Sequence, residues 1–282
     1  MIKVNPVARA MWTGTLLATL ALTCHAASDA QQACARQYQP QSGQPGKDVV
    51  WMPTNDALTR RMLAMAAVKS SDLVYDLDAG DGKIAIAAAR DFGARAVGVE
   101  YNPDLARLAQ CLANAAGVAD RVRIVQGDIF ETDFSDATVV MLYLLPELNL
   151  QLRPTILAMK PGTRVVSHSF LMDDWRPDER SSNEDGQAYM WIVPANVAGT
   201  WRFEPKRADG EAFTLDLDQT FQEVRGSNKN IAVTGRLSGD QLQLTFAPDA
   251  PISSLHGRID KNTMDARVIR GGKALEYVGK RS

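Results

Sequence analysis

The 282-residue chain contains few of the side chains that enzymes use for covalent or metal chemistry. It has three cysteines and three histidines. His25, His168 and His256 show no metal-ligand spacing. We find no order of serine, histidine and aspartate that indicates a hydrolytic triad. The sequence therefore gives little support to a metal centre or to nucleophilic hydrolysis.

An excess of charge of one sign is also missing. The chain has 31 basic and 33 acidic residues, so its formal net charge is −2. Its basic residues are scattered rather than clustered. Proteins that bind nucleic acids neutralise phosphates with a concentrated positive field. The sequence therefore predicts no nucleic-acid partner.

The sequence has no comfortable transmembrane segment, because the apolar run over residues 11–22 is shorter than the about 20 residues that a spanning helix needs. Lys3 and Arg9 precede this run, and small residues follow it up to Ala27. This layout predicts a signal peptide over residues 1–27 and an exported protein, periplasmic or secreted, with no stable membrane span after cleavage. An uncleaved N-terminal membrane anchor is the alternative.

The next segment is polar. Residues 28–47 are rich in glutamine, serine, proline and glycine, and we expect a flexible leader that takes no part in a core. The mature chain keeps Cys34 and Cys111. A disulfide between them is left open, but the favoured interpretation is an idle Cys34 and a reduced, buried Cys111.

The most informative stretch runs from Leu73 to Ile86. An apolar, β-branched run leads into an acidic turn with Gly80 and Gly82, and an alanine-rich helix follows. Glycine lets a backbone approach a ligand closely, and the first turn of a helix presents unpaired amides. This stretch therefore predicts a strand, a ligand-cradling turn and a helix.

Acidic residues end the first three predicted strands. Asp76 closes the first, Glu100 closes the second about 20 residues beyond the turn, where a carboxylate reaches a ribose, and Asp128 follows the third. We expect the three to share one rim, because ligands of parallel sheets lie beyond the carboxyl ends of the strands. The spacing alone leaves a nicotinamide oxidoreductase as a competitor, although the glycine pattern of that class is not met.

Strand-like and helical patterns alternate up to residue 193. Besides the first strand, we expect helices over residues 55–68, 82–92, 103–116 and 147–158. Further strands are expected over residues 95–100, 122–126, 137–143, 163–170 and 189–193. This alternation predicts a doubly wound, mainly parallel, Rossmann-like α/β sheet in a domain of residues 48–195.

The pattern changes after residue 196. Short segments that turns separate indicate an antiparallel β-module over residues 196–282, a small barrel or sandwich. Its strands are expected at 200–203, 212–217, 220–225, 231–237, 241–246, 254–259, 264–269 and 274–279. The module either packs on the first domain and steadies it, or holds a site for a ligand or partner.

The acids and glycines of the first three strand ends resemble the motifs of class I S-adenosylmethionine-dependent methyltransferases: Asp76, Gly80, Gly82, Glu100, Asp128 and Ile129. The resemblance implies S-adenosyl-L-methionine as cofactor. It also implies that the first turn holds the methionine part, Glu100 holds the ribose hydroxyls, and Asp128 with Ile129 addresses the adenine.

Three further motifs narrow the resemblance. Residues 51–54 (WMPT), 143–146 (YLLP) and 175–178 (WRPD) make the chain similar to the ATP synthase c-subunit lysine methyltransferase group. The resemblance implies methyl transfer to a protein lysine or another amine. Pro53 and Thr54 would then lie near the cofactor, and Tyr143 and Pro146 would line the catalytic channel. Trp175 either closes over the site or anchors local packing.

One residue departs from the family pattern. Asp78 stands where the family has glycine, and its Cβ and charge could cost on the order of 1 to 3 kcal/mol of cofactor binding. The charge could instead face the amino group or sulfonium of the cofactor. The alternative function is therefore an exported, non-catalytic binding protein that reuses the methyltransferase fold, its cofactor site weakened by Asp78.

Overall fold

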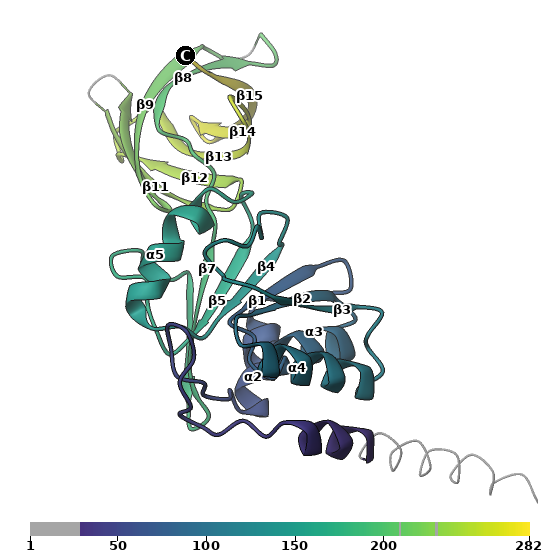
Figure 1. The fold of residues 1–282 in the computed structure, drawn as a ribbon. Helices are drawn as coiled ribbons and strands as arrows, with labels where there is room; N and C mark the ends of the chain where they lie inside the picture. The colour runs from purple at the N-terminus through teal and green to yellow at the C-terminus, as the bar shows by residue number, and fades with distance from the viewer. Residues whose placement is uncertain (1–28, 209, 229–230) are drawn as a thin grey trace, which may run out of the picture.

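The computed structural model describes residues 29–208, 210–228 and 231–282 (Figure 1). The signal peptide expected over residues 1–27 lies outside this part of the chain. Among the described residues, no helix combines the length and the apolar character that a membrane crossing requires.

The first domain contains helices and strands in alternation, followed by a strand hairpin. Its elements are α2 (Asp56–Met65), β1 (Leu73–Leu77), α3 (Lys83–Phe92), β2 (Arg95–Glu100), α4 (Pro103–Ala115), β3 (Val122–Gln126), β4 (Val139–Leu142), α5 (Pro146–Leu157), β5 (Arg164–His168), β6 (Glu179–Asn183) and β7 (Gly186–Ile192).

The described strands of this domain form one sheet in the order β3-β2-β1-β4-β5-β7-β6. Strands β1 to β5 pair in parallel, whereas β7 runs antiparallel to β5 and pairs with β6 in a hairpin. Figure 1 shows α2, α3 and α4 on one face and α5 on the other. The predicted doubly wound, mainly parallel sheet is confirmed. Its strand order reverses between β1 and β4, where such sheets bind ligands.

Small side chains let the helices approach this sheet and one another. Helix α3 buries Ala85, Ala87, Ala88 and Ala89. Gly82 caps its N-terminus with a φ of 78°, and a Cβ there would lie 2.9 Å from the Cβ of Ala109 in α4. Gly82 therefore permits both the left-handed turn and the close packing of α3 on α4.

The second domain is a closed barrel in the described chain, with strand order β10-β11-β12-β13-β14-β15-β8-β9. Its strands are β8 (Gly199–Pro205), β9 (Phe213–Thr220), β10 (Glu223–Asn228), β11 (Ile231–Ser238), β12 (Gln241–Phe246), β13 (Ile252–Asp260), β14 (Thr263–Arg270) and β15 (Lys273–Arg281). All neighbours are antiparallel, and buried side chains such as Trp201, Phe203 and Tyr277 fill the interior. The prediction of an antiparallel module is confirmed, and the form it takes is a barrel.

Trp175 joins the barrel to the first domain. Its side chain is fully buried, and its indole Nε1 donates to Oε1 of Gln222 over 2.9 Å. Gln222 in turn donates to the carbonyl oxygen of Arg176, and Arg236 pairs with Asp178 at 2.6 Å. Of the two alternatives for Trp175, the structure therefore supports the packing anchor rather than a residue that closes over the site.

The N-terminal segment corrects two expectations. Residues 29–37 are helical, and Cys34 is 2% exposed and joined to Cys111 of α4 by a disulfide. The expected flexible leader therefore contributes to a core, and the interpretation of Cys34 and Cys111 as unpaired thiols is wrong. The polar composition of residues 28–47 predicts flexibility, but one disulfide can hold in place a segment that buries little apolar surface.

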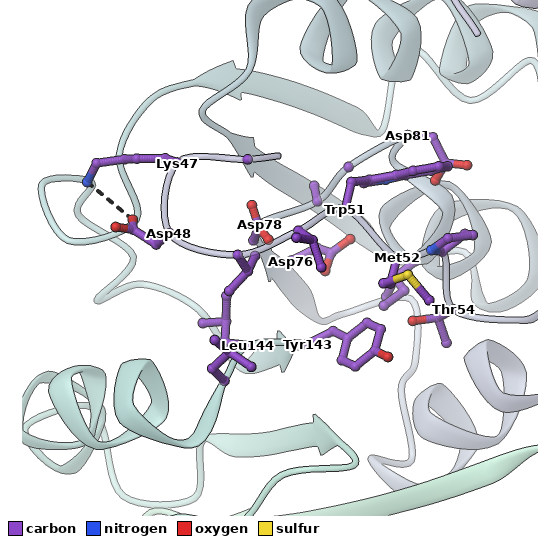
Figure 2. A pocket seen from close by; sticks show the side chains of 18 of the residues that line it. Lys47, Asp48, Trp51, Met52, Thr54, Asp76, Asp78, Asp81, Tyr143 and Leu144 are labelled. Atoms are coloured by element: carbon purple, nitrogen blue, oxygen red, sulfur yellow. Dashed lines mark ion pairs between the residues drawn. The ribbon is translucent and has the colours of Figure 1, made fainter. Parts of the chain in front are cut away.

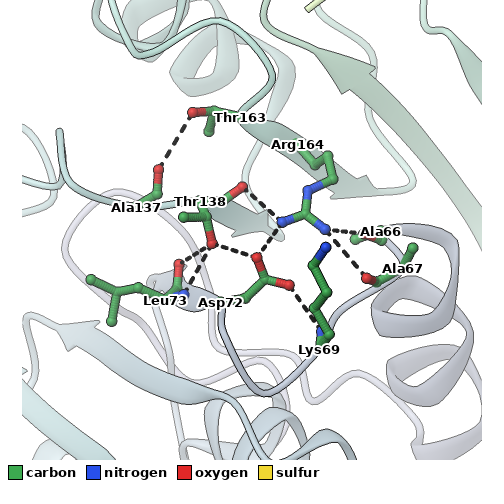
Figure 3. Close-up of polar contacts among 9 residues, drawn as sticks. All are labelled: Ala66, Ala67, Lys69, Asp72, Leu73, Ala137, Thr138, Thr163 and Arg164. Atoms are coloured by element: carbon green, nitrogen blue, oxygen red, sulfur yellow. Dashed lines mark hydrogen bonds and ion pairs between the residues drawn. The ribbon is translucent and has the colours of Figure 1, made fainter.

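A buried polar cluster ties α2 to the amino ends of β1, β4 and β5 (Figure 3). Arg164 Nη2 pairs with Asp72 Oδ1 at 2.5 Å, and the Thr138 hydroxyl donates to the same oxygen over 2.8 Å. Arg164 Nη1 also donates to the carbonyl oxygen of Ala66, which follows α2. Burial alone would raise the pKa of Asp72, but hydrogen bonds from Arg164, the Lys69 amide and Thr138 lower it.

We predict that Arg164→Met lowers the free energy of unfolding by about 3 kcal/mol, because it leaves the Asp72 carboxylate buried without a cation. Urea denaturation of the variant and the native chain measures this loss. Arg90→Met is the control, since Arg90 and Asp91 form an exposed pair whose loss costs less than about 1 kcal/mol. Equal losses in the two variants would contradict the importance of the cluster.

Candidate functional site

A cavity of about 510 Å³ opens at the carboxyl ends of β1 and β4 (Figure 2). Three parts of the chain line it: residues 45–54, the turn between Asp76 and Ile84, and residues 143–145 with Phe170. Its size lies within the range of about 300 to 1,000 Å³ that is usual for small-molecule sites. The structure therefore confirms a ligand-sized cavity at the predicted position in the sheet.

Asp76, the residue before the last of β1, has its carboxylate buried in the wall of this cavity. The residue is 3% exposed, and its Oδ2 has no hydrogen-bond partner among the described residues. Burial raises the pKa of Asp76 to about 8, and the nearby Asp78, Asp81 and Glu100 contribute further. A buried carboxylate without a partner is costly, so this oxygen is suited to a cationic or hydrogen-bonding ligand.

Asp78 lies in the turn with a φ of 70°, a left-handed conformation that costs a non-glycine residue about 1 kcal/mol or more. Its side chain lines the cavity, and Figure 2 shows it beside Asp76. Burial raises its pKa to about 7, with further contributions from Glu100 and Asp48. A glycine would adopt this turn freely, so the aspartate carries a conformational cost here.

Glu100 holds the turn after β1 through hydrogen bonds from backbone amides. Its Oε2 accepts from the Gly80 amide over 2.8 Å, and its Oε1 accepts from the Asn102 amide over 2.7 Å. Burial raises the pKa of Glu100, although these amides oppose the rise. Neither Glu100 nor Gly82 lines the large cavity, whereas Gly80 does.

The third predicted acid lies at a smaller, neighbouring cavity of about 20 Å³. Asp128 and Ile129 line it together with Asp78, which faces both cavities. Asp128 Oδ2 pairs with Lys47 Nζ at 2.5 Å, and its Oδ1 accepts from the Phe130 amide. These bonds, that of Lys47 first, lower the pKa of Asp128.

Tyr143 lines the other end of the large cavity. Its ring stacks on His168 with the centroids 3.7 Å apart, and His168 Nδ1 lies 3.2 Å from the Thr54 hydroxyl. Burial, with a smaller contribution from Arg61, lowers the pKa of His168 to about 4, so the imidazole is neutral at neutral pH.

Of the other predicted motif residues near Tyr143, two line the cavity and one does not. Pro53 and Thr54, expected near the cofactor, line the cavity. Asn55 fixes their position, because its side chain caps α2 by accepting from the Leu58 amide and donates to the Asp185 carbonyl oxygen. Pro146 is the exposed first residue of α5 and does not line the cavity.

Two residues of the site escape sequence reasoning. Lys47 falls at the end of the expected leader, although the apolar residues 49–51 that follow it could have indicated packing. His168 lies 114 residues from Thr54 and 25 from Tyr143, so no local spacing connects the three.

The sequence matches the family model described as the ANTKMT methyltransferase domain over residues 76–179. A protein-lysine N-methyltransferase from Saccharolobus islandicus (strain REY15A) is 45% identical over 153 residues, which are 51% of this chain and 94% of that protein. An ATP synthase c-subunit lysine N-methyltransferase from Xenopus laevis is 30% identical over 129 residues, which are 45% of this chain and 56% of that protein.

A solved structure shows the same relation. It is an RNA methyltransferase from Salinibacter ruber in complex with S-adenosyl-L-homocysteine, with 46% identity, coverage of 56% of this chain and 100% of that chain, and a TM-score of 0.51. The fold, the cavity and these matches define an S-adenosylmethionine-dependent methyltransferase. More narrowly, the chain belongs to the family of protein-lysine N-methyltransferases that includes the Saccharolobus protein. The predicted resemblance is confirmed.

We predict that the ligand-free chain becomes less stable as the pH rises from 6.5 to 8.5. The raised pKa values of Asp76 and Asp78 mean that the folded state holds protons that the unfolded chain has already released, so their stabilisation is lost through about pH 7 to 8. The expected loss in unfolding free energy is about 1 to 3 kcal/mol. Urea denaturation at both pH values measures it.

Asp76→Asn is the matched variant, because it removes the titrating group and keeps the shape. Its stability is expected to change less over the same interval. The window begins at pH 6.5 because His168, with its lowered pKa, acts in the opposite direction at lower pH. An equal slope in both proteins would show that Asp76 does not titrate there.

Proposed function

We propose that the chain transfers the methyl group of S-adenosyl-L-methionine to the side-chain amine of a protein lysine in the large cavity. The observation that carries the proposal is Oδ2 of Asp76, which has no partner among the described residues and lies in the wall of a ligand-sized cavity, in a chain 45% identical over 153 residues to a protein-lysine N-methyltransferase. When bound, S-adenosyl-L-methionine supplies an electrophilic methyl group on a sulfonium.

The residues at the turn fit this cofactor. Asp76 offers a buried oxygen to a positively charged amino group. Gly80 keeps the backbone open, since a Cβ there would lie 2.5 Å from Nε1 of Trp51. Gly82 provides no side-chain cap for α3, and the Lys83 amide donates to Asp81 Oδ1 over 3.2 Å, so among the described residues only later amides of the first helical turn are left for an anionic group. We assign the amino-acid part of the cofactor to this turn.

The nucleoside part is assigned to the second and third strand ends. Glu100 already accepts one amide on each oxygen, and each oxygen keeps a further lone pair for a ribose hydroxyl. Asp128 and Ile129 lie at the next strand end, where an adenine would complete the ligand along the rim.

The acceptor amine is assigned to the end of the cavity at Tyr143. Leu144, Leu145 and Phe170 make this end apolar, and such surroundings lower the pKa of an amine and favour its neutral, nucleophilic form. The Tyr143 ring offers a face to the amine while the amine is still a cation. His168 beneath it is neutral, so the stack holds the ring without adding a repelling charge.

The charges of the cavity support a lysine rather than a nucleic acid. Asp48, Asp76, Asp78 and Asp81 all line it, with Lys47 and Lys83 as its basic residues. Lys47 pairs with Asp128 and Lys83 with Asp56, so the acids dominate the lining. An incoming ammonium group lowers the raised pKa values of Asp76 and Asp78 and pairs with their carboxylates, whereas a phosphate gains no such partner. The name of the Salinibacter protein specifies RNA. For the cavity of this chain, RNA is a less suitable acceptor than a protein lysine.

We further propose that the protein acts after export. The sequence predicts a signal peptide, and a disulfide between Cys34 and Cys111 is typical of an oxidising compartment. The cofactor is made in the cytosol, so an exported enzyme needs an imported supply. Fractionation that finds the unprocessed chain in the cytosol alone would contradict export.

Calorimetric titration of S-adenosyl-L-methionine and assay of labelled methyl transfer test the activity. We expect one-to-one binding in the micromolar range and methyl groups on lysine of acceptor proteins, identified after hydrolysis. Labelled methyl groups on RNA would show that RNA, and not a protein lysine, is the acceptor. No heat up to millimolar cofactor would instead support a non-catalytic protein that reuses the fold.

Asp78 gives a sharper prediction. Asp78→Asn is expected to weaken S-adenosyl-L-methionine binding about tenfold, equivalent to about 1.4 kcal/mol, because the carboxylate faces a positively charged ligand. Binding of the less positive S-adenosyl-L-homocysteine is expected to change little, and asparagine tolerates the left-handed turn. Tighter cofactor binding by Asp78→Asn or Asp78→Gly would show that Asp78 obstructs the site.

A further inference from the structure

The end of the site that faces Asp128 is too small for a nucleoside. The small cavity there measures about 20 Å³, and a single water needs about 10 to 15 Å³ on the same kind of measure. A purine base is many times larger than a water molecule. A nucleoside therefore reaches Asp128 only after a lining segment moves.

The segment that closes this end is residues 43–52, which we call the strap. It folds back on itself, because the Gly43 amide donates to the Trp51 carbonyl oxygen and the Trp51 amide to that of Gln44, each over 2.9 Å. At its tip the Gly46 amide donates to the Val49 carbonyl oxygen. Figure 2 shows the strap crossing the cavity with Lys47 and Asp48 at one end.

Lys47 fastens the strap over the small cavity. Its Nζ pairs with Asp128 at 2.5 Å and with Asp48 at 3.3 Å. The same ammonium lies 5.4 Å from the ring centroid of Tyr101 and 5.8 Å from that of Phe130, within the range of cation–π attraction. Lys47 thus occupies the carboxylate and the aromatic faces that a base would use.

The chain that leads into the strap is covalently attached to the first domain. The disulfide between Cys34 and Cys111 fixes the chain that precedes it to α4. Tethering raises the effective concentration of Lys47 at Asp128 without any new contact. Opening is therefore a movement of the strap itself, while the helical residues 29–37 stay attached.

We propose that Lys47 is a built-in competitor of the cofactor's base, so that cofactor binding requires Lys47 to leave Asp128 and the strap to open. This inference rests on the proposed function. Lys47 then lowers the affinity for the cofactor, because each binding event breaks the Lys47–Asp128 pair and two cation–π contacts.

Calorimetric titration of S-adenosyl-L-homocysteine into the full-length, oxidised chain tests the proposal. This ligand lacks the sulfonium charge, so its affinity responds less to the cavity's general field. Lys47→Gln is expected to bind it about three- to tenfold more tightly than the native chain, as expected from removal of an exposed pair and its aromatic contacts. Lys47→Arg keeps the contacts and is expected to bind like the native chain.

Lys206→Gln is the matched control. Lys206 Nζ pairs with Asp265 at 2.7 Å on the barrel, so this variant loses the same charge and an equivalent ion pair far from the site. Its affinity is expected to equal that of the native chain. Unchanged binding by Lys47→Gln would overturn the proposal. Weaker binding would overturn it too, because it would show that Lys47 stabilises the bound ligand.

Salt provides an independent measurement. Raising ionic strength from about 0.01 to 0.15 M shortens the screening length from about 30 to 8 Å and weakens an exposed pair. Affinity for S-adenosyl-L-homocysteine is expected to rise with salt in the native chain and to stay flat in Lys47→Gln; the same slope in both overturns the proposal. If no variant binds the ligand, the proposed function itself fails, whereas equal affinities refute Lys47 alone.

Discussion

One buried carboxylate oxygen without a partner among the described residues, Oδ2 of Asp76, is the constraint on which the site depends. The turn after β1 holds it in place, and Glu100 supports that turn through the Gly80 amide. Asp78 and Asp81 add negative charge around it instead of neutralising it. Stability and binding are therefore opposed in this region, because the arrangement that weakens the empty protein favours a positively charged ligand.

Much of this arrangement could be predicted from the sequence. Asp76, Gly80 and the alternation of elements locate the turn, since parallel strands bring their carboxyl ends to one edge. Hydrophobic periodicity also indicates the barrel strands, because inward and outward residues alternate along each of them. Strand β6 was missed because its residues are nearly all exposed and show no such alternation.

Other features depend on contacts between distant parts of the chain. The Cys34–Cys111 bond spans 77 residues, and composition indicated only a polar leader. His168 acquires its place from the pairing of β5 with β4 and from the stack with Tyr143. Glu100 was expected at the ligand, yet its oxygens are first used by two backbone amides. Sequence motifs thus identify which residues gather, but not which of them touch the ligand directly.

The barrel begins and ends at neighbouring strands. β8 and β15 pair with each other, so the barrel closes its own hydrogen bonds without a strand from the first domain. In evolutionary terms, recombination can append such a unit to a methyltransferase domain at a single junction and leave both sheets intact. The Saccharolobus relative, matched over nearly its whole length by about half of this chain, is consistent with that history. The buried Trp175–Gln222 bond is a contact that makes one structure of the two joined units.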